Sequence, residues 1–149
     1  MKWSIRACLG GARIWDERGQ CAGRLRRNGP RWRAEDAQGG TVAELEREGE
    51  SGLRLVVKGQ PVRALLTLAD GCPPIRLPRA QHIAFSLDGA AYELWQDASR
   101  LVRVRCGGQL IGEYRPAPRE RLSLSCDAPA LTLALLACLM AREDDLPIV

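Results

Sequence analysis

The sequence lacks every short motif that usually identifies an enzyme or a metal site. No nucleophile elbow, Walker loop, glycine-rich dinucleotide motif or H-E-x-x-H pair occurs in its 149 residues. The six cysteines include no C-x-x-C pair, which a zinc site or a thiol redox site would need. We therefore expect a non-enzymatic protein that holds no metal and no cofactor.

Signals for export and for membrane insertion are also missing. Arg6 and Arg13 interrupt the apolar segment that a signal peptide would need. No apolar run reaches the ~18 residues of a membrane-spanning helix. These absences predict a cytoplasmic protein, in which the cysteines are reduced and buried as small hydrophobic side chains.

Lysine is scarce, since only Lys2 and Lys58 among the 22 basic residues are lysines, which leaves 20 arginines. Arginine binds phosphate and carboxylate groups with a planar fork of donors, so an arginine-rich surface suits an anionic partner. The net charge is only +4, because 18 acidic residues are interspersed. A nucleic-acid-binding protein usually has a stronger and more concentrated basic charge, and genome base composition would by itself explain the preference for arginine.

Most of the chain has the pattern of short antiparallel strands. Apolar residues alternate with polar ones over residues 53–57, 83–87, 102–104 and 122–126, which places each apolar set on one face of a half-buried strand. Pairs that favour tight turns separate these runs: Gly39-Gly40, Asp70-Gly71, Asp88-Gly89 and Gly107-Gly108. With 149 residues and 46% apolar composition, residues 1–149 form one mainly β domain.

Two further local patterns refine this prediction. Asp16-x-x-Gly19 and Asp36-x-x-Gly39 repeat the same spacing twenty residues apart, and we interpret both as acidic turns within hairpins. The segment 71–78 contains three prolines, which cannot donate to a strand ladder. We expect it to connect two halves of the sheet.

The most distinctive segment is apolar and close to the C-terminus. Residues 128–141 read APALTLALLACLMA, with Thr132 as the one polar side chain, Asp127 as a candidate N-cap and Pro129 in the first turn. We expect a helix over about 128–142, and its fourteen residues 128–141 would span ~21 Å, too short for a bilayer. Because it is apolar all round, it must be covered on every side. We predict an antiparallel, closed or nearly closed β-barrel around this buried helix, the alternatives being a peripheral membrane anchor or an oligomer interface.

This arrangement resembles the tubby C-terminal-like superfamily, which includes the tubby domain, the plant LURP-one-related proteins and the phospholipid scramblases. The resemblance rests on ARIWDERGQCAGRL and RWRAEDAQGGTVAEL near the start and on LALLACLMAREDD near the end. It implies a barrel around the helix, with some strands short or missing because this chain is shorter than most members. It assigns neither the tubby headgroup residues nor the scramblase calcium site to positions in this sequence.

The candidate ligand-binding segment is an arginine-rich hairpin over residues 24–33. Its proposed ligand-binding residues are Arg24, Arg26, Arg27, Arg31, Trp32 and Arg33. The arginines would hold phosphate groups, with the tryptophan ring at a lipid or base face. In the alternative interpretation, these arginines pair with the acidic residues Glu35, Asp36 or Glu44. We expect the other three tryptophans, Trp3, Trp15 and Trp95, to pack in the core or between strands.

Three functions are compatible with these patterns. The first is a non-enzymatic binding or scaffold protein that recognises anionic phospholipid headgroups, or a protein partner, and therefore lies peripherally at a membrane. The second is a small β-barrel that binds single-stranded nucleic acid through the same hairpin. The third is an enzyme whose site is assembled around His82 and a nearby carboxylate.

Overall fold

The computed structural model describes residues 1–48, 52–68, 80–97, 100–116 and 118–142. They form twelve strands and one helix. The strands are β1 (Lys2–Cys8), β2 (Gly11–Trp15), β3 (Cys21–Asn28), β4 (Arg31–Asp36), β5 (Thr41–Glu48), β6 (Gly52–Val57), β7 (Gln60–Leu68), β8 (Ala80–Leu87), β9 (Ala90–Gln96), β10 (Val102–Cys106), β11 (Gln109–Arg115) and β12 (Arg121–Leu124), and the helix is α1 (Ala130–Arg142).

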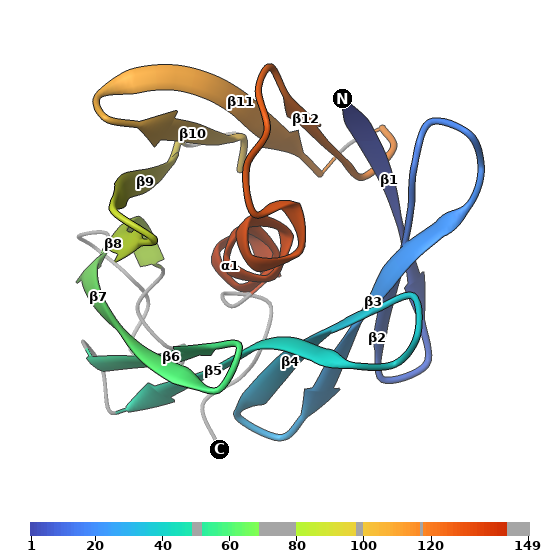
Figure 1. Cartoon of the computed structure of the whole chain (residues 1–149), viewed down its shortest axis with the longest axis horizontal. Helices are drawn as coiled ribbons and strands as arrows, with labels where there is room; N and C mark the ends of the chain where they lie inside the picture. Colours follow the sequence, from blue (N-terminus) through green and yellow to red (C-terminus); the bar gives the residue numbers. More distant parts are fainter. Residues whose placement is uncertain (49–51, 69–79, 98–99, 117, 143–149) are drawn as a thin grey trace.

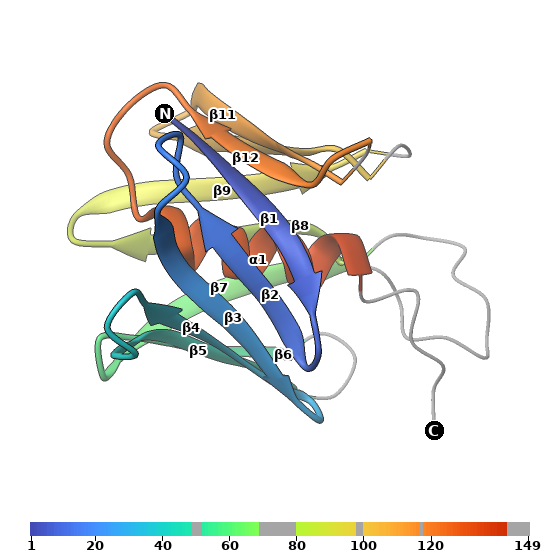
Figure 2. The same cartoon turned by 90° about the vertical axis from the view of Figure 1, so that its right-hand side faces the viewer.

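The strands form a closed antiparallel barrel with the helix in its centre (Figure 1). Each strand pairs with its neighbours in the chain, and β1 closes the ring by pairing with β12, where Trp3 lies opposite Leu122. Figure 2 shows α1 running through the barrel between the strands. The predicted mainly β fold and its buried C-terminal helix are therefore confirmed.

Alternation along each strand separates the inside of the barrel from the outside. In β2, Ala12 and Ile14 are each 1% exposed and face inward, whereas Arg13 between them is exposed. Tight turns connect several strands, and Asp88-Gly89 and Gly107-Gly108 adopt the positive φ angles that a two-residue hairpin requires. The predicted turn at Asp70-Gly71 and the proline-rich segment 71–78 lie outside the described residues.

The two Asp-x-x-Gly segments form the same turn, as the repeat predicts. The Asp16 carboxylate accepts hydrogen bonds from the backbone N–H groups of Arg18 and Gln20, both at 2.9 Å. Asp36 binds the amides of Gln38 and Gly40 in the same way, at 3.0 and 2.8 Å. These aspartates stabilise the hairpins, so they are structural groups.

Asp97 and Arg100 repeat two features of the Asp-x-x-Gly turns without a glycine. The N–H of Arg100 donates to the Asp97 carbonyl at 3.1 Å, and Arg100 has a positive φ of 66°, as Gly19 and Gly39 do. Its guanidinium lies 3.4 Å from the Ala141 carbonyl oxygen in the last turn of α1. A cation is favourable there because carbonyl groups at a helix C-terminus are otherwise unsatisfied.

The helix is buried on all sides, as its composition predicts. Residues 133–141 are each at most 3% exposed. The Leu133 N–H donates to the Pro129 carbonyl at 3.0 Å, so the helix begins at Ala130 with Pro129 before it, and the predicted cap at Asp127 is two residues too early. Gly23 of β3 faces the helix, and a Cβ there would come within 2.9 Å of Leu131.

A polar contact also joins the helix to the barrel wall. The Cys138 thiol, which is fully buried on α1, lies 3.5 Å from a carboxylate oxygen of Glu120. The same oxygen accepts a hydrogen bond from the hydroxyl of Tyr114 on β11. The buried Tyr114 hydroxyl and the buried Cys138 thiol therefore both have a polar partner, the Glu120 carboxylate.

Burial corrects the expectation about cysteine but not the one about tryptophan. Five cysteines are described and all are free thiols, but Cys8, Cys21 and Cys126 are exposed. Cys126 follows the end of β12, where the inward alternation no longer applies. Trp3 packs against the core, and Trp95 packs across a strand pair opposite His82, both as expected, although Trp95 is 43% exposed on the outside of the barrel.

Candidate functional site

Arginine dominates the outer surface of the first four strands. The alternation of side chains along β1–β4 directs six arginines to the outside of the barrel. One carboxylate of these strands, that of Glu35, points the same way and lies opposite Arg24. We call this surface the basic face, and its residues are Arg6, Arg13, Arg24, Arg26, Arg31 and Arg33. Four of the six belong to the hairpin identified in the sequence.

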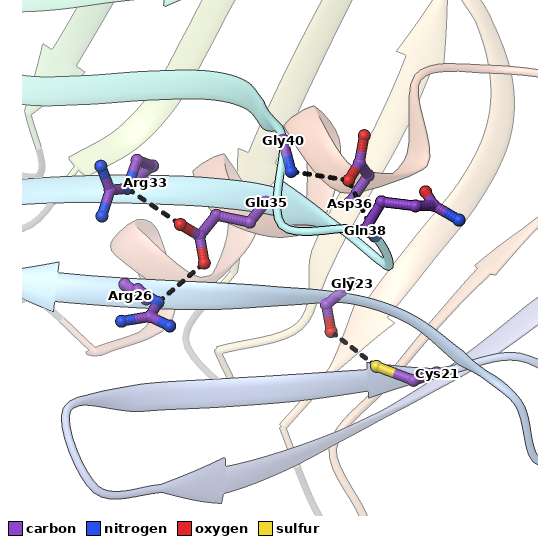
Figure 3. A network of polar contacts seen from close by, with 8 residues as sticks. All are labelled: Cys21, Gly23, Arg26, Arg33, Glu35, Asp36, Gln38 and Gly40. Atoms are coloured by element: carbon purple, nitrogen blue, oxygen red, sulfur yellow. Dashed lines mark hydrogen bonds and ion pairs between the residues drawn. The ribbon is translucent and has the colours of Figure 1, made fainter.

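Three arginines of the predicted hairpin are neutralised by glutamates, in line with the alternative interpretation. Glu35 lies between two of them, with its oxygens 2.7 Å from Arg26 and 3.4 Å from Arg33 (Figure 3). Its side chain is only 12% exposed, because the two guanidinium groups cover it. Arg31 lies 3.3 Å from Glu46 on β5. Asp36, another expected partner, binds turn amides instead.

Two of the predicted ligand-binding residues face the inside of the barrel. Trp32 is 5% exposed and belongs to the hydrophobic core. The Arg27 guanidinium lies 5.3 Å from the centre of the Trp32 ring, across the strand pair. The expectation of a tryptophan ring at a lipid or base face is therefore wrong, since the strand register directs residues 27 and 32 to the opposite side from the other arginines.

An open depression of about 380 Å³ lies beside this hairpin. It is lined by Arg26, Asn28, Arg31, Trp32, Arg33, Glu44, Leu45, Glu46, Arg54 and Val56. Although four arginines contribute, three of them contact Glu35 or Glu46. The depression therefore has little uncompensated charge with which to attract an anion.

The remaining arginines of the basic face form a row across three strands. Arg13 on β2 lies directly opposite Arg6 on β1 and, on its other side, opposite Arg24 on β3. Directly opposed residues on one sheet face have Cβ atoms ~5 Å apart. Arg6 and Arg13 are exposed and Arg24 is half-buried. We call these three residues the arginine ladder.

Two members of this ladder were not predicted from the sequence. Arg6 and Arg13 belong to strands that precede the predicted hairpin, and their spacing is not regular along the chain. The available signal is that each is flanked by inward-facing apolar residues, such as Ile5 beside Arg6. This alternation places them outside, but only the pairing register places them side by side.

The lone histidine is part of a separate cluster on the outside of the barrel. The His82 ring stacks on Trp95 with ring centres 3.9 Å apart, and its Nε2 lies 3.7 Å from a Glu93 oxygen. The Trp95 indole N–H donates to the same oxygen at 3.3 Å. A histidine beside a carboxylate fits the third hypothesis, but His82 is not among the residues that line the depression beside the β3–β4 hairpin.

Other possible types of site receive no support from the described residues. Within those ranges, no three His, Cys, Asp or Glu side chains are grouped as metal ligands would be. The helix in this part of the chain does not have the length and apolar character needed to cross a bilayer.

Burial is the main cause that raises the pKa of the Tyr92 hydroxyl, with smaller contributions from Cys106 and Cys126.

Comparison with known proteins yields no relative, since no family model, curated protein or solved structure matches the chain.

Proposed function

We propose that this chain is a non-enzymatic binding or scaffold protein of the tubby C-terminal-like type, which binds anionic lipid headgroups through its basic face. One observation carries the proposal: six outward arginines on β1–β4 are accompanied by a single outward carboxylate within those strands. Such a surface attracts phosphate groups through both its local potential and its arginine donors.

The barrel interior supports a ligand site on the outer surface. Helix α1 occupies the centre of the barrel, and its middle residues have no contact with solvent. A ligand the size of a lipid headgroup would have to displace this helix in order to bind inside. We therefore place recognition on the strand faces, with the protein in the cytoplasm and peripherally at a membrane.

Nucleic acid is the weaker second ligand for the same surface. Binding of single strands usually relies on aromatic rings on which the bases stack. Trp32, the aromatic residue within the predicted hairpin, is buried. The basic face therefore has arginine donors but no stacking platform at the hairpin.

Cosedimentation with vesicles tests the proposal. We expect saturable binding to phosphatidylcholine vesicles that contain phosphatidylserine or a phosphoinositide, and a steep loss of binding as salt is raised. Charge reversal of Arg24, Arg26, Arg31 and Arg33 together should abolish it. Binding that survives both treatments would refute the proposal, and tighter binding to single-stranded oligonucleotides than to vesicles would favour the nucleic-acid alternative.

A further inference from the structure

We infer that the β1–β2 hairpin is the part of the protein that contacts the membrane, with the arginine ladder holding a lipid phosphomonoester and Leu9 inserting between the headgroups. This inference rests on the proposed function and deepens it. It names a site that is centred on β2 and shares only Arg24 with the β3–β4 hairpin. It also names the chemistry of the ligand, which is a dianionic phosphate with three terminal oxygens.

The ladder is the part of the basic face whose charge has no counterion. Among the described residues, Arg6, Arg13 and Arg24 form no ion pair. Like charges directly opposite one another destabilise a sheet. Three guanidinium groups in a row therefore raise the energy of the free protein, and a bridging anion would offset that repulsion.

The carboxylates nearest to the ladder have other partners. Glu35 lies opposite Arg24 in the register, but its two oxygens contact Arg26 and Arg33. Glu17 accepts from the Lys2 N–H at 2.7 Å and lies 3.7 Å from the N-terminal amine.

The Asp16 carboxylate binds amides of its own turn. Every acidic side chain that flanks β1–β3 in the described structure is thus engaged, and the ladder remains available to an external anion.

The spacing of the ladder suits a phosphomonoester. Each arginine offers a fork of donors, and a phosphomonoester has a charge of about −1.5 to −2 with three acceptor oxygens. The next outward pair of β2 and β3 is Gly11 with Arg26. Because glycine has no side chain, the position beside Arg13 on β2 is left open. A Cβ at Gly11 would collide with the Leu25 carbonyl oxygen, and the gap is therefore built into the strand packing.

An apolar tip next to the ladder points to a lipid surface as the source of this phosphate. Leu9 in the β1–β2 turn is 105% exposed, so it packs against nothing in the described structure. It is three residues from Arg6, about 10 Å along an extended strand. The Arg27 N–H donates to the Gly10 carbonyl at 2.7 Å and holds the tip against β3. Apolar groups of peripheral proteins are buried to a similar depth, ~5–10 Å, at the boundary between headgroups and acyl chains.

The experiment uses two variants, each with a matched control on β7, on another part of the barrel wall. Arg13→Gln is matched by Arg63→Gln, which removes another exposed arginine without a described partner. Leu9→Ser is matched by Leu65→Ser, since Leu65 is 59% exposed. Cosedimentation with phosphatidylcholine vesicles containing phosphatidic acid measures membrane affinity. An NMR titration with glycerol 3-phosphate, observing arginine side-chain N–H signals, measures recognition of the phosphate alone.

We expect Arg13→Gln to weaken vesicle binding about tenfold and to remove the shifts caused by glycerol 3-phosphate. Leu9→Ser should weaken vesicle binding about tenfold and leave those shifts unchanged. The two β7 variants should bind as the unaltered protein does.

Equal losses of vesicle binding in Arg13→Gln and Arg63→Gln would refute phosphate binding by the arginine ladder, because net charge alone would then determine the affinity. Full vesicle binding by Leu9→Ser would overturn membrane contact through the hairpin tip. If both variants bind normally while the fourfold reversal on β3–β4 abolishes binding, the inference fails and the proposed function stands. If the unaltered protein binds no anionic vesicle, both fail.

Discussion

The inner surface of strands β1–β4 is closely packed, whereas the outer surface carries three arginines that no acidic side chain of the described structure neutralises. On the inner surface, Ile14, Leu25 and Ala34 are each at most 1% exposed and pack around a helix with no face left for water. On the outer surface, Arg6, Arg13 and Arg24 are directly opposed and lack a counterion among the described residues. Packing for stability explains the first arrangement. It does not explain the second, which is why we propose that the second serves ligand binding.

The largest effect is expected inside the barrel. Leu135 is fully buried on α1, and Leu135→Ala should lower the free energy of unfolding by about 2–5 kcal/mol, through lost burial and the cavity that remains. Urea denaturation followed by circular dichroism measures the change. Leu110→Ala, at a position that is 55% exposed, is the control and should change stability by less than about 0.5 kcal/mol. Similar losses in both variants would show that α1 is not enclosed.

The next effect concerns the compensated arginines of the outer surface. Glu35→Gln removes the carboxylate shared by Arg26 and Arg33, and should destabilise the protein by about 1 kcal/mol, a modest value because both arginines are about half exposed. It should also strengthen vesicle binding, since two more arginines become available. Glu113→Gln removes one exposed pair with Arg115 and should have a smaller effect on stability and none on binding. Weaker vesicle binding by Glu35→Gln would contradict the distinction between paired and free arginines.

A polar group on the enclosed helix provides the opposite test. The Thr132 hydroxyl is fully buried and has no hydrogen-bond partner in the described structure. Thr132→Val keeps the shape of the side chain and should stabilise the protein by about 1 kcal/mol, because it removes an unsatisfied polar atom. Thermal unfolding measures the change against Thr41→Val at an exposed position. A lower melting temperature for Thr132→Val would indicate that the hydroxyl has a partner, such as an ordered water.

The smallest effect is expected from the ladder itself. Arg13→Gln relieves repulsion with Arg6 and Arg24, and should raise the free energy of unfolding by about 0.5 kcal/mol at low salt and by less at high salt. Denaturation at two salt concentrations measures this difference. Arg63→Gln, which removes one like-charge pair with Arg54 where Arg13→Gln removes two, should give a smaller rise. A loss of stability in Arg13→Gln at low salt would show that the ladder contributes to folding, and would remove the contrast between the two surfaces.

The fold was largely predictable because its strongest signals are local. A segment with one polar side chain, Thr132, in fourteen positions predicts full burial wherever it lies. Likewise, the Asp-x-x-Gly turns depend on hydrogen bonds within five residues, which the sequence alone specifies. The first residue of the helix was less predictable, since Asp127 and Pro129 are both suitable at a helix start.

The candidate site was only partly predictable. Arginine-rich composition identified Arg24 and its neighbours, but the sequence placed Trp32 on the surface, whereas the structure buries it. Alternation of side chains along a strand defines two faces, but the pairing with neighbouring strands decides which of them faces the barrel interior. The error at Trp32 arises from this ambiguity.

Local composition was enough to require that the apolar helix be covered on every side, because residues 133–141 offer water no polar face, but the closure of the strands around it was decided by their pairing. Which arginines are free depends instead on how the strands pair. Arg26 and Arg33 meet Glu35 across one strand pair, whereas Arg13 meets two further arginines across another. Charge pairing depends on distances between strands, and those distances are fixed only when the barrel closes in one register.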